Sequence, residues 1–193
     1  MERHINTVNR CRPGFGASCS FCCGSHNYVL GEDEIEEIFS KRTEDFNTLI
    51  PVNPFNPINR VNRVHPEDSL EEKLIKDGMQ CSYIGIEDYD DNAHLCCLIY
   101  AEDHEGKAYE SFISGTCRSF LCAAWDELTD REVLFAAELM KDWYYYSLFI
   151  NSTELVTKLC AEYSSPKDIG EDTLDELKTE LRRRLLEEDM ING

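Results

Sequence analysis

The sequence predicts a small α+β domain, mostly helical with a short hairpin, organised around cysteine-ligated metal. Three observations predict this fold class: stretches with helical spacing of apolar residues, two strand-like segments around an acidic turn, and ten cysteines among 193 residues. At 42% hydrophobic residues the chain can bury one core without needing disulfides to fold. The cysteines are therefore better explained by metal than by crosslinks.

Two long helices are predicted from apolar residues at helical spacing. The first spans Glu32 to about Phe46, and its acidic opening suits the positive end of a helix dipole. The second follows Thr129, which forms a capping box with Glu132, and neither Gly nor Pro interrupts it before Pro166. Its apolar face is broad enough to predict a largely buried helix.

A hairpin is predicted from two strand-like segments, residues 81–86 and 94–100, with the acidic turn 87–92 between them. Residues 51–66 hold four prolines and four asparagines, which predict a long connector, and a shorter helix is expected over 66–76.

The last predicted helix runs from Thr173 to Glu188, with a capping box from Thr173 to Glu176. We divide the chain into a cysteine-cluster metal-binding domain, residues 1–165, and a C-terminal helix or tail, residues 166–193. This helix either packs on the domain or serves a protein partner.

The charge balance argues against nucleic acid as a partner. Thirty-eight acidic and nineteen basic residues give a formal net charge of −19, whereas nucleic-acid affinity draws on Lys and Arg that neutralise phosphates. The only basic cluster, residues 182–184, sits among glutamates at helical spacing and is interpreted as a solvated helix face.

The sequence predicts a cytoplasmic protein with no membrane association. No apolar run at the N-terminus resembles a signal peptide, and no stretch approaches the ~18 continuous apolar residues of a membrane span. In a reducing compartment, clustered cysteines are more often metal ligands or catalytic thiols than disulfides.

Nine of the cysteines fall into two groups that only folding can bring together. They are Cys11, Cys19, Cys22 and Cys23, and then Cys81, Cys96, Cys97, Cys117 and Cys122. The CxxC spacing of Cys19 and Cys22 lets both sulfurs reach one metal. Side chains of the vicinal pair Cys22 and Cys23 diverge, so they feed two sites or two atoms of one cluster.

These residues resemble the YkgJ-like CxxCxxCC family, described as a zinc- or iron-chelating domain. The resemblance covers about residues 11–150 and rests on Cys19-Ser-Phe-Cys22-Cys23, the lone Cys81, Cys97-Leu-Ile-Tyr100 and Cys117-Arg118-Ser119-Phe120 with Cys122 after it. The ligands that it implies are Cys11, Cys19, Cys22, Cys23, Cys81, Cys97, Cys117 and Cys122.

The metal and its use stay open at this point. Four-thiolate zinc would be structural, because no coordination position is left for catalysis, whereas an iron–sulfur cluster would allow electron transfer or redox sensing. The resemblance extends to a domain of flagellin lysine N-methylases, so an enzyme is an alternative; a redox or protein-interaction module is another. Cys160 and, at even odds, Cys96 are interpreted as small core hydrophobes.

No Ser-His-Asp order, phosphate loop or HExxH pattern occurs. The five histidines show no paired metal spacing and are interpreted as surface or hydrogen-bonded residues. His26, three residues after Cys23, is the best reserve ligand among them.

Overall fold

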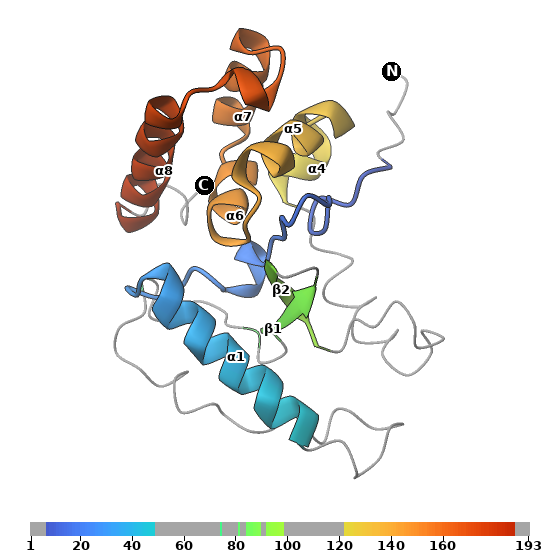
Figure 1. The fold of residues 1–193 in the computed structure, drawn as a ribbon, viewed down its shortest axis with the longest axis vertical. Coiled ribbons are helices and arrows are strands. Elements are labelled where there is room, and N and C mark those ends of the chain that lie inside the picture. Colours follow the sequence, from blue (N-terminus) through green and yellow to red (C-terminus); the bar gives the residue numbers. More distant parts are fainter. Residues whose placement is uncertain are drawn as a thin grey trace.

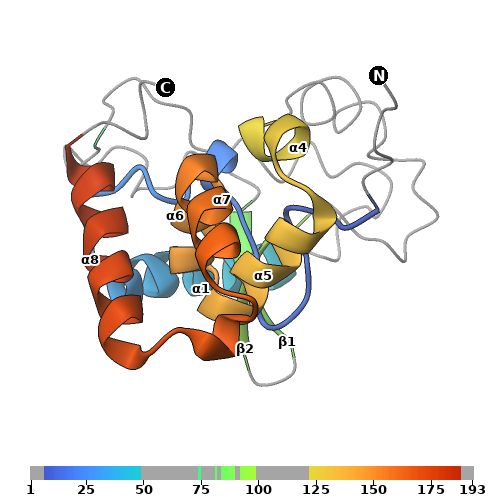
Figure 2. The same cartoon turned by 90° about the horizontal axis from the view of Figure 1, so that it is seen from above.

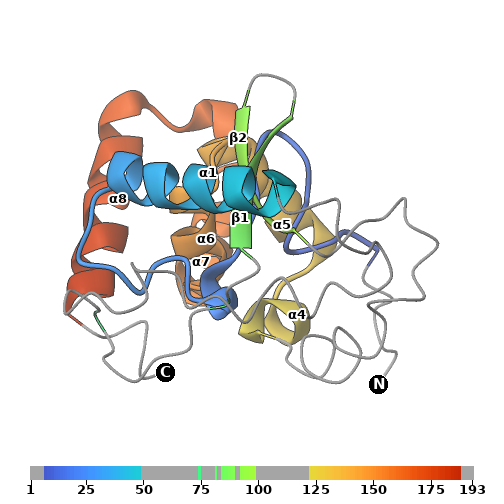
Figure 3. The same cartoon turned by 90° about the horizontal axis from the view of Figure 1, so that it is seen from below.

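The computed structural model describes residues 7–48, 74, 81, 84–89, 92–98 and 122–187. This part of the chain holds six α-helices and a two-stranded antiparallel sheet, which confirms the predicted α+β class. The elements form three layers (Figure 1): α1 (Glu32–Thr48) on one side, the hairpin and the N-terminal segment in the middle, and α4 to α8 on the other. Figure 3 shows α1 crossing the hairpin.

Helix α1 confirms the first predicted helix. Its start is fixed by the N–H of Gly31, which donates to the Glu34 carboxylate at 2.9 Å, and three acidic residues occupy the first turn. Ile35 and Phe39 are buried on the face toward the hairpin layer. The apolar spacing in the sequence therefore placed both the helix and its inner face correctly.

The hairpin consists of β1 (Ile84–Tyr89) and β2 (Asn92–Cys97). Tyr89 pairs with Asn92, so the acidic segment mostly continues the strands, and the predicted turn over 87–92 was too long. Helix α1 lies close to β1, because Thr43 donates to the Ile86 carbonyl oxygen at 2.8 Å and accepts from its N–H at 2.9 Å. A Cβ at Gly85 would collide with the Thr43 hydroxyl.

The helical layer begins after Cys122 with α4 (Ala123–Glu127), α5 (Asp130–Met140), α6 (Tyr144–Ile150), α7 (Thr153–Glu162) and α8 (Glu171–Leu186). Figure 2 shows α8 at one end of this layer, α4 and α5 at the other, and α6 and α7 between them. The predicted capping box is confirmed at the start of α5, where the side chains of Thr129 and Glu132 each bond to the other's backbone N–H.

The single long helix predicted after Thr129 was wrong, since the chain breaks twice. Helix α5 ends at Lys141, which adopts a left-handed conformation (φ 56°), and Asp142 then accepts the N–H of Tyr145 at 2.6 Å. Helix α6 ends at Asn151, whose side chain donates back to the Ser147 carbonyl oxygen at 2.8 Å. Short polar side chains that bond to nearby backbone offer an alternative to the helix and produce both breaks.

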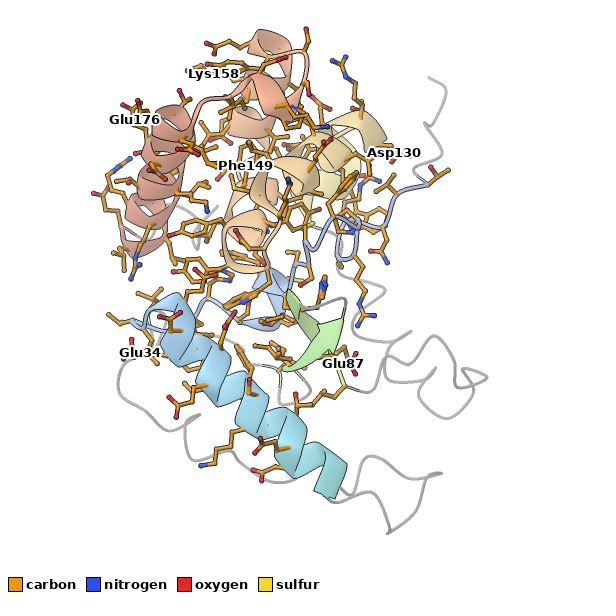
Figure 4. The ribbon with its side chains drawn as sticks, viewed as in Figure 1. Glu34, Glu87, Asp130, Phe149, Lys158 and Glu176 are labelled. Atoms are coloured by element: carbon orange, nitrogen blue, oxygen red, sulfur yellow. The ribbon has the colours of Figure 1, made fainter. Side chains whose placement is uncertain are left out.

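The core lies between the helical layer and the middle layer. Phe149 is fully buried among the helices, whereas Lys158 of α7 and Glu176 of α8 lie on the outside (Figure 4). Trp143, also buried, ties the two outer layers together, because its indole N–H donates to Glu36 of α1 at 2.6 Å.

Helix α8 begins at Glu171, after the N-cap Gly170, so the predicted start at Thr173 with its capping box was wrong. Its apolar face packs on α6 within this chain, with Leu177, Leu181 and Leu185 buried. On the outer face Glu180 accepts from both Arg183 and Arg184, as a solvated, charge-compensated face predicts.

The predicted connector over 51–66 and the short helix over 66–76 lie outside the described residues. Where the structure describes the chain, its helices are too short or too polar to span a bilayer.

Candidate metal centre

Cys11 and Cys19 are brought together by a closed loop in the N-terminal segment. The N–H of Cys19 donates to the carbonyl oxygen of Cys11 at 2.9 Å, so the chain leaves and returns at the same place. It reverses at a bridge between Gly14 and Ala17, where Gly14 (φ 97°) and Gly16 (φ 78°) supply left-handed conformations. The two cysteines therefore converge although their spacing is not CxxC.

The vicinal pair lies on a short 3-10 helix, η1 (Phe21–Cys23), which ends at Gly24 (φ 87°). Successive residues of a 3-10 helix are about 120° apart around its axis, so the two side chains leave in different directions. The two thiols still interact, and this interaction lowers the pKa of Cys22 and raises that of Cys23.

A first thiol group gathers around Cys22. It consists of Cys11, Cys19, Cys22 and Cys122. The Cys11 residue keeps an exposed surface, yet desolvation of its thiol raises its pKa to about 12, and the nearby thiols of Cys22 and Cys122 contribute. Burial also raises the pKa of Cys19, with Cys11 and Cys22 adding to the effect. Each member thus lies within electrostatic range of at least one other.

Cys122 joins this group from a distant part of the sequence, at the N-cap of α4. Burial raises the pKa of its thiol, and the Cys22 thiol adds to the rise. The nearby backbone of Ala124 and Trp125 opposes this rise, and the Trp125 N–H donates to the Cys122 carbonyl oxygen at 3.0 Å. The start of α4 therefore presents a thiol to the first thiol group.

A second thiol group gathers around Cys23. It consists of Cys23, Cys81 and Cys97. The N–H of Cys81 donates to the Cys23 carbonyl oxygen at 2.9 Å. Cys97 of β2 pairs with Ile84 of β1, and the Ile84 N–H donates to the Cys81 carbonyl oxygen at 3.3 Å. The interaction with Cys22 and burial are the largest causes of the raised pKa of Cys23, and the thiols of Cys81 and Cys97 both add smaller contributions. The vicinal pair thus joins the two groups.

Arg10, the residue before Cys11, fixes the N-terminal segment to the helical layer. It is 1% exposed, and its guanidinium donates to Asp130 and to the Val8 carbonyl oxygen, both at 2.6 Å. It also lies over the Trp125 ring of α4, 5.0 Å from the centroid. Figure 4 shows Asp130 of α5 beside the N-terminal segment. No pattern in the sequence indicated that this arginine is buried.

Arg42 plays the equivalent part for the second thiol group. From α1 it donates to the Cys81 carbonyl oxygen at 3.3 Å and to the Tyr28 hydroxyl at 3.1 Å, and it stacks on Phe39. This role of Arg42 was not predicted, although the sequence held a signal: Arg42 follows Ile35 and Phe39 at helical spacing and so belongs to the inner face of α1.

His26 is not a reserve ligand in this structure, because both ring nitrogens have partners. Nε2 lies 3.0 Å from the Tyr144 carbonyl oxygen, which can only accept, so Nε2 carries the proton. Nδ1 then accepts from the Ser25 hydroxyl at 2.9 Å. Burial lowers the pKa of His26 to about 3. The interpretation as a hydrogen-bonded histidine is confirmed here.

The two thiol groups are gathered but do not yet form a coordination shell. In the ranges that the structure describes, no three Cys, His, Asp or Glu side chains are arranged to hold a metal ion. Among those residues, Ser18 Oγ is the one buried side-chain N or O atom without a hydrogen-bond partner.

Three cysteines are assigned to neither thiol group. Cys117, the eighth predicted ligand, lies outside the described residues. Cys96 is buried and stands opposite Gly85, one position away from Cys97 and therefore on the other face of the hairpin. Cys160 is half-buried on α7, where it packs against the core. This supports the interpretation of Cys96 and Cys160 as packing residues.

No protein-family model, curated protein or solved structure matches this chain. The resemblance to the YkgJ-like family therefore stays a prediction, and the functional argument depends on the thiols themselves.

Proposed function

We propose that this chain is a metal-binding protein that chelates zinc or an iron–sulfur cluster through its cysteines, with the metal as part of the fold. The observation that carries the proposal is proximity: seven of the eight predicted ligands, from separate segments, each lie within electrostatic range of another, and backbone hydrogen bonds join Cys11 to Cys19 and Cys23 to Cys81. Independent core packing of cysteines does not account for such proximity.

The two groups suggest how the ligands are divided. The first thiol group has the four sulfurs that a closed tetrahedral site needs. The second has three, and Cys117 is the predicted ligand that would complete it. The contact between the vicinal thiols fits two neighbouring ions or one larger cluster equally well. Binding would require the side chains of each group to turn onto a common centre.

The proposed ligands must lose their protons when metal binds. The pKa of Cys11 is raised to about 12 and that of Cys19 is also raised, both mainly by burial, so these thiols are protonated at neutral pH without metal. A metal ion offsets the desolvation of the thiolates and displaces the protons. Affinity should therefore rise with pH.

We further propose a cytoplasmic location. The nine cysteines of the described ranges are all free thiols, including the adjacent Cys22 and Cys23. A reducing compartment keeps such thiols available for metal.

The test is anaerobic purification followed by metal analysis and a visible spectrum. We expect about two zinc ions per chain if each group takes one ion, and a brown, charge-transfer-absorbing protein if iron–sulfur is bound. A well-folded protein that contains neither metal, and takes up neither when it is supplied, would overturn the proposal.

A further inference from the structure

The Cys19 sulfur accepts a hydrogen bond from a side chain that lies far along the sequence. The Asn151 side-chain amide at the end of α6 donates to it over 3.7 Å. The backbone of Phe21 and the hydroxyl of Ser147 are near enough to lower the pKa of Cys19 in part. Cys19 is thus the sulfur of the first thiol group that the helical layer contacts most directly through α6.

Asn151 is held in the orientation that this contact needs. Its amide has two N–H groups; one donates to the Ser147 carbonyl oxygen at 2.8 Å, and the other points to the Cys19 sulfur. Ser147 is not a side-chain donor to this sulfur, because its hydroxyl donates to the Ser18 carbonyl oxygen at 3.4 Å. The amide of Asn151 therefore makes the better-defined side-chain bond.

Donors of this kind act on a metal through its ligand. An N–H group that bonds to a thiolate withdraws negative charge from the sulfur, fixes its direction, and changes affinity and charge-transfer energy. Such donors would offset negative charge here, because four thiolates around a divalent ion leave two negative charges in a chain whose net charge is already −19.

We propose that Asn151 is a positioning residue of the first metal site, where its amide orients the Cys19 thiolate and reduces the charge on that sulfur. The inference rests on the proposed function and adds to it a residue that is not a ligand. The break between α6 and α7 places Asn151 at the end of α6, where its amide can reach the Cys19 sulfur.

Cobalt(II) is a suitable probe, because thiolate sites accept it in place of zinc and its sulfur charge-transfer band reports on the thiolates. Protein made metal-free under reducing conditions is titrated with cobalt, and affinity is measured by competition with a chelator. The variants are Asn151→Leu, which removes both donors at similar volume, and Asn151→Asp, which keeps the shape. Ser152→Ala is the matched control, because it removes a bond to the Leu148 carbonyl oxygen within the same segment.

Both Asn151 variants should bind cobalt about 10- to 100-fold more weakly. In Asn151→Leu the charge-transfer band should also move to lower energy, a shift that a purely structural role would not cause. Ser152→Ala should match the wild type in both. Unchanged affinity and band position in a folded Asn151 variant would overturn this inference alone. A wild-type protein that binds no cobalt would overturn the proposed function as well.

Discussion

Replacing Cys22 and Cys23 together by serine is expected to abolish metal binding and to leave the protein insoluble. The pair is where the two thiol groups meet, so its loss removes a ligand from each group. Structural zinc contributes about 10–16 kcal/mol in small metal-dependent folds, which is more than the whole stability of a typical domain. Metal content and soluble yield after anaerobic purification provide the measurement.

Single substitutions separate the two groups. Cys22→Ser should lower the metal content of the first group, and Cys23→Ser that of the second, each leaving about half of the metal if two ions bind. Cys160→Ser is the control, because Cys160 lies on α7, no thiol of either group contributes to its raised pKa, and the variant should retain all metal. Full metal content in the double variant would show that the vicinal pair does not ligate.

Acidification is expected to destabilise the fold through His26. Its pKa is lowered by burial from 6.5 to about 3 in the folded state. Between these two pH values His26 is protonated in the unfolded chain but stays neutral in the folded chain, so the free energy of unfolding falls as the pH is lowered. The slope is about 1.4 kcal/mol per pH unit for one proton, and it ends below the folded pKa, where both states are protonated.

The measurement compares wild type and His26→Gln by urea unfolding at pH 7 and pH 5, both in the same metal state. The variant is less stable at pH 7, since it loses a satisfied buried ring, but it should lose about 2 kcal/mol less than wild type between the two pH values. Val29→Ala, a change at an exposed position without a titrating side chain, is the control and should keep the wild-type slope. Equal slopes for wild type and His26→Gln would contradict the prediction.

Local signals in the sequence predicted most of the fold. Helix α1, the hairpin and the capping box at Thr129 each depend on residues within a few positions of one another. The breaks at Asp142 and Asn151 were missed because a side chain that bonds to its own backbone looks the same in sequence as one that faces solvent. The early start of α8 was missed for a related reason, since Gly170 supplies no side-chain cap.

The candidate site was predictable in composition but not in arrangement. The CxxC spacing and the vicinal pair indicated thiolate chemistry. The convergence of Cys11 with Cys19 depends on a loop closed by one backbone hydrogen bond, and the division at Cys22 depends on the tertiary fold. Asn151 lies far along the chain from Cys19, and no local pattern links an amide to a sulfur at such a distance.

Ligation of the metal by thiolates is measured by X-ray absorption at the metal edge of the anaerobically purified protein. The predicted result is a first shell of sulfur neighbours at about 2.3 Å, about four per ion. A shell of nitrogen and oxygen neighbours at about 2.0–2.2 Å would contradict it, because the metal would then be held by residues other than these cysteines.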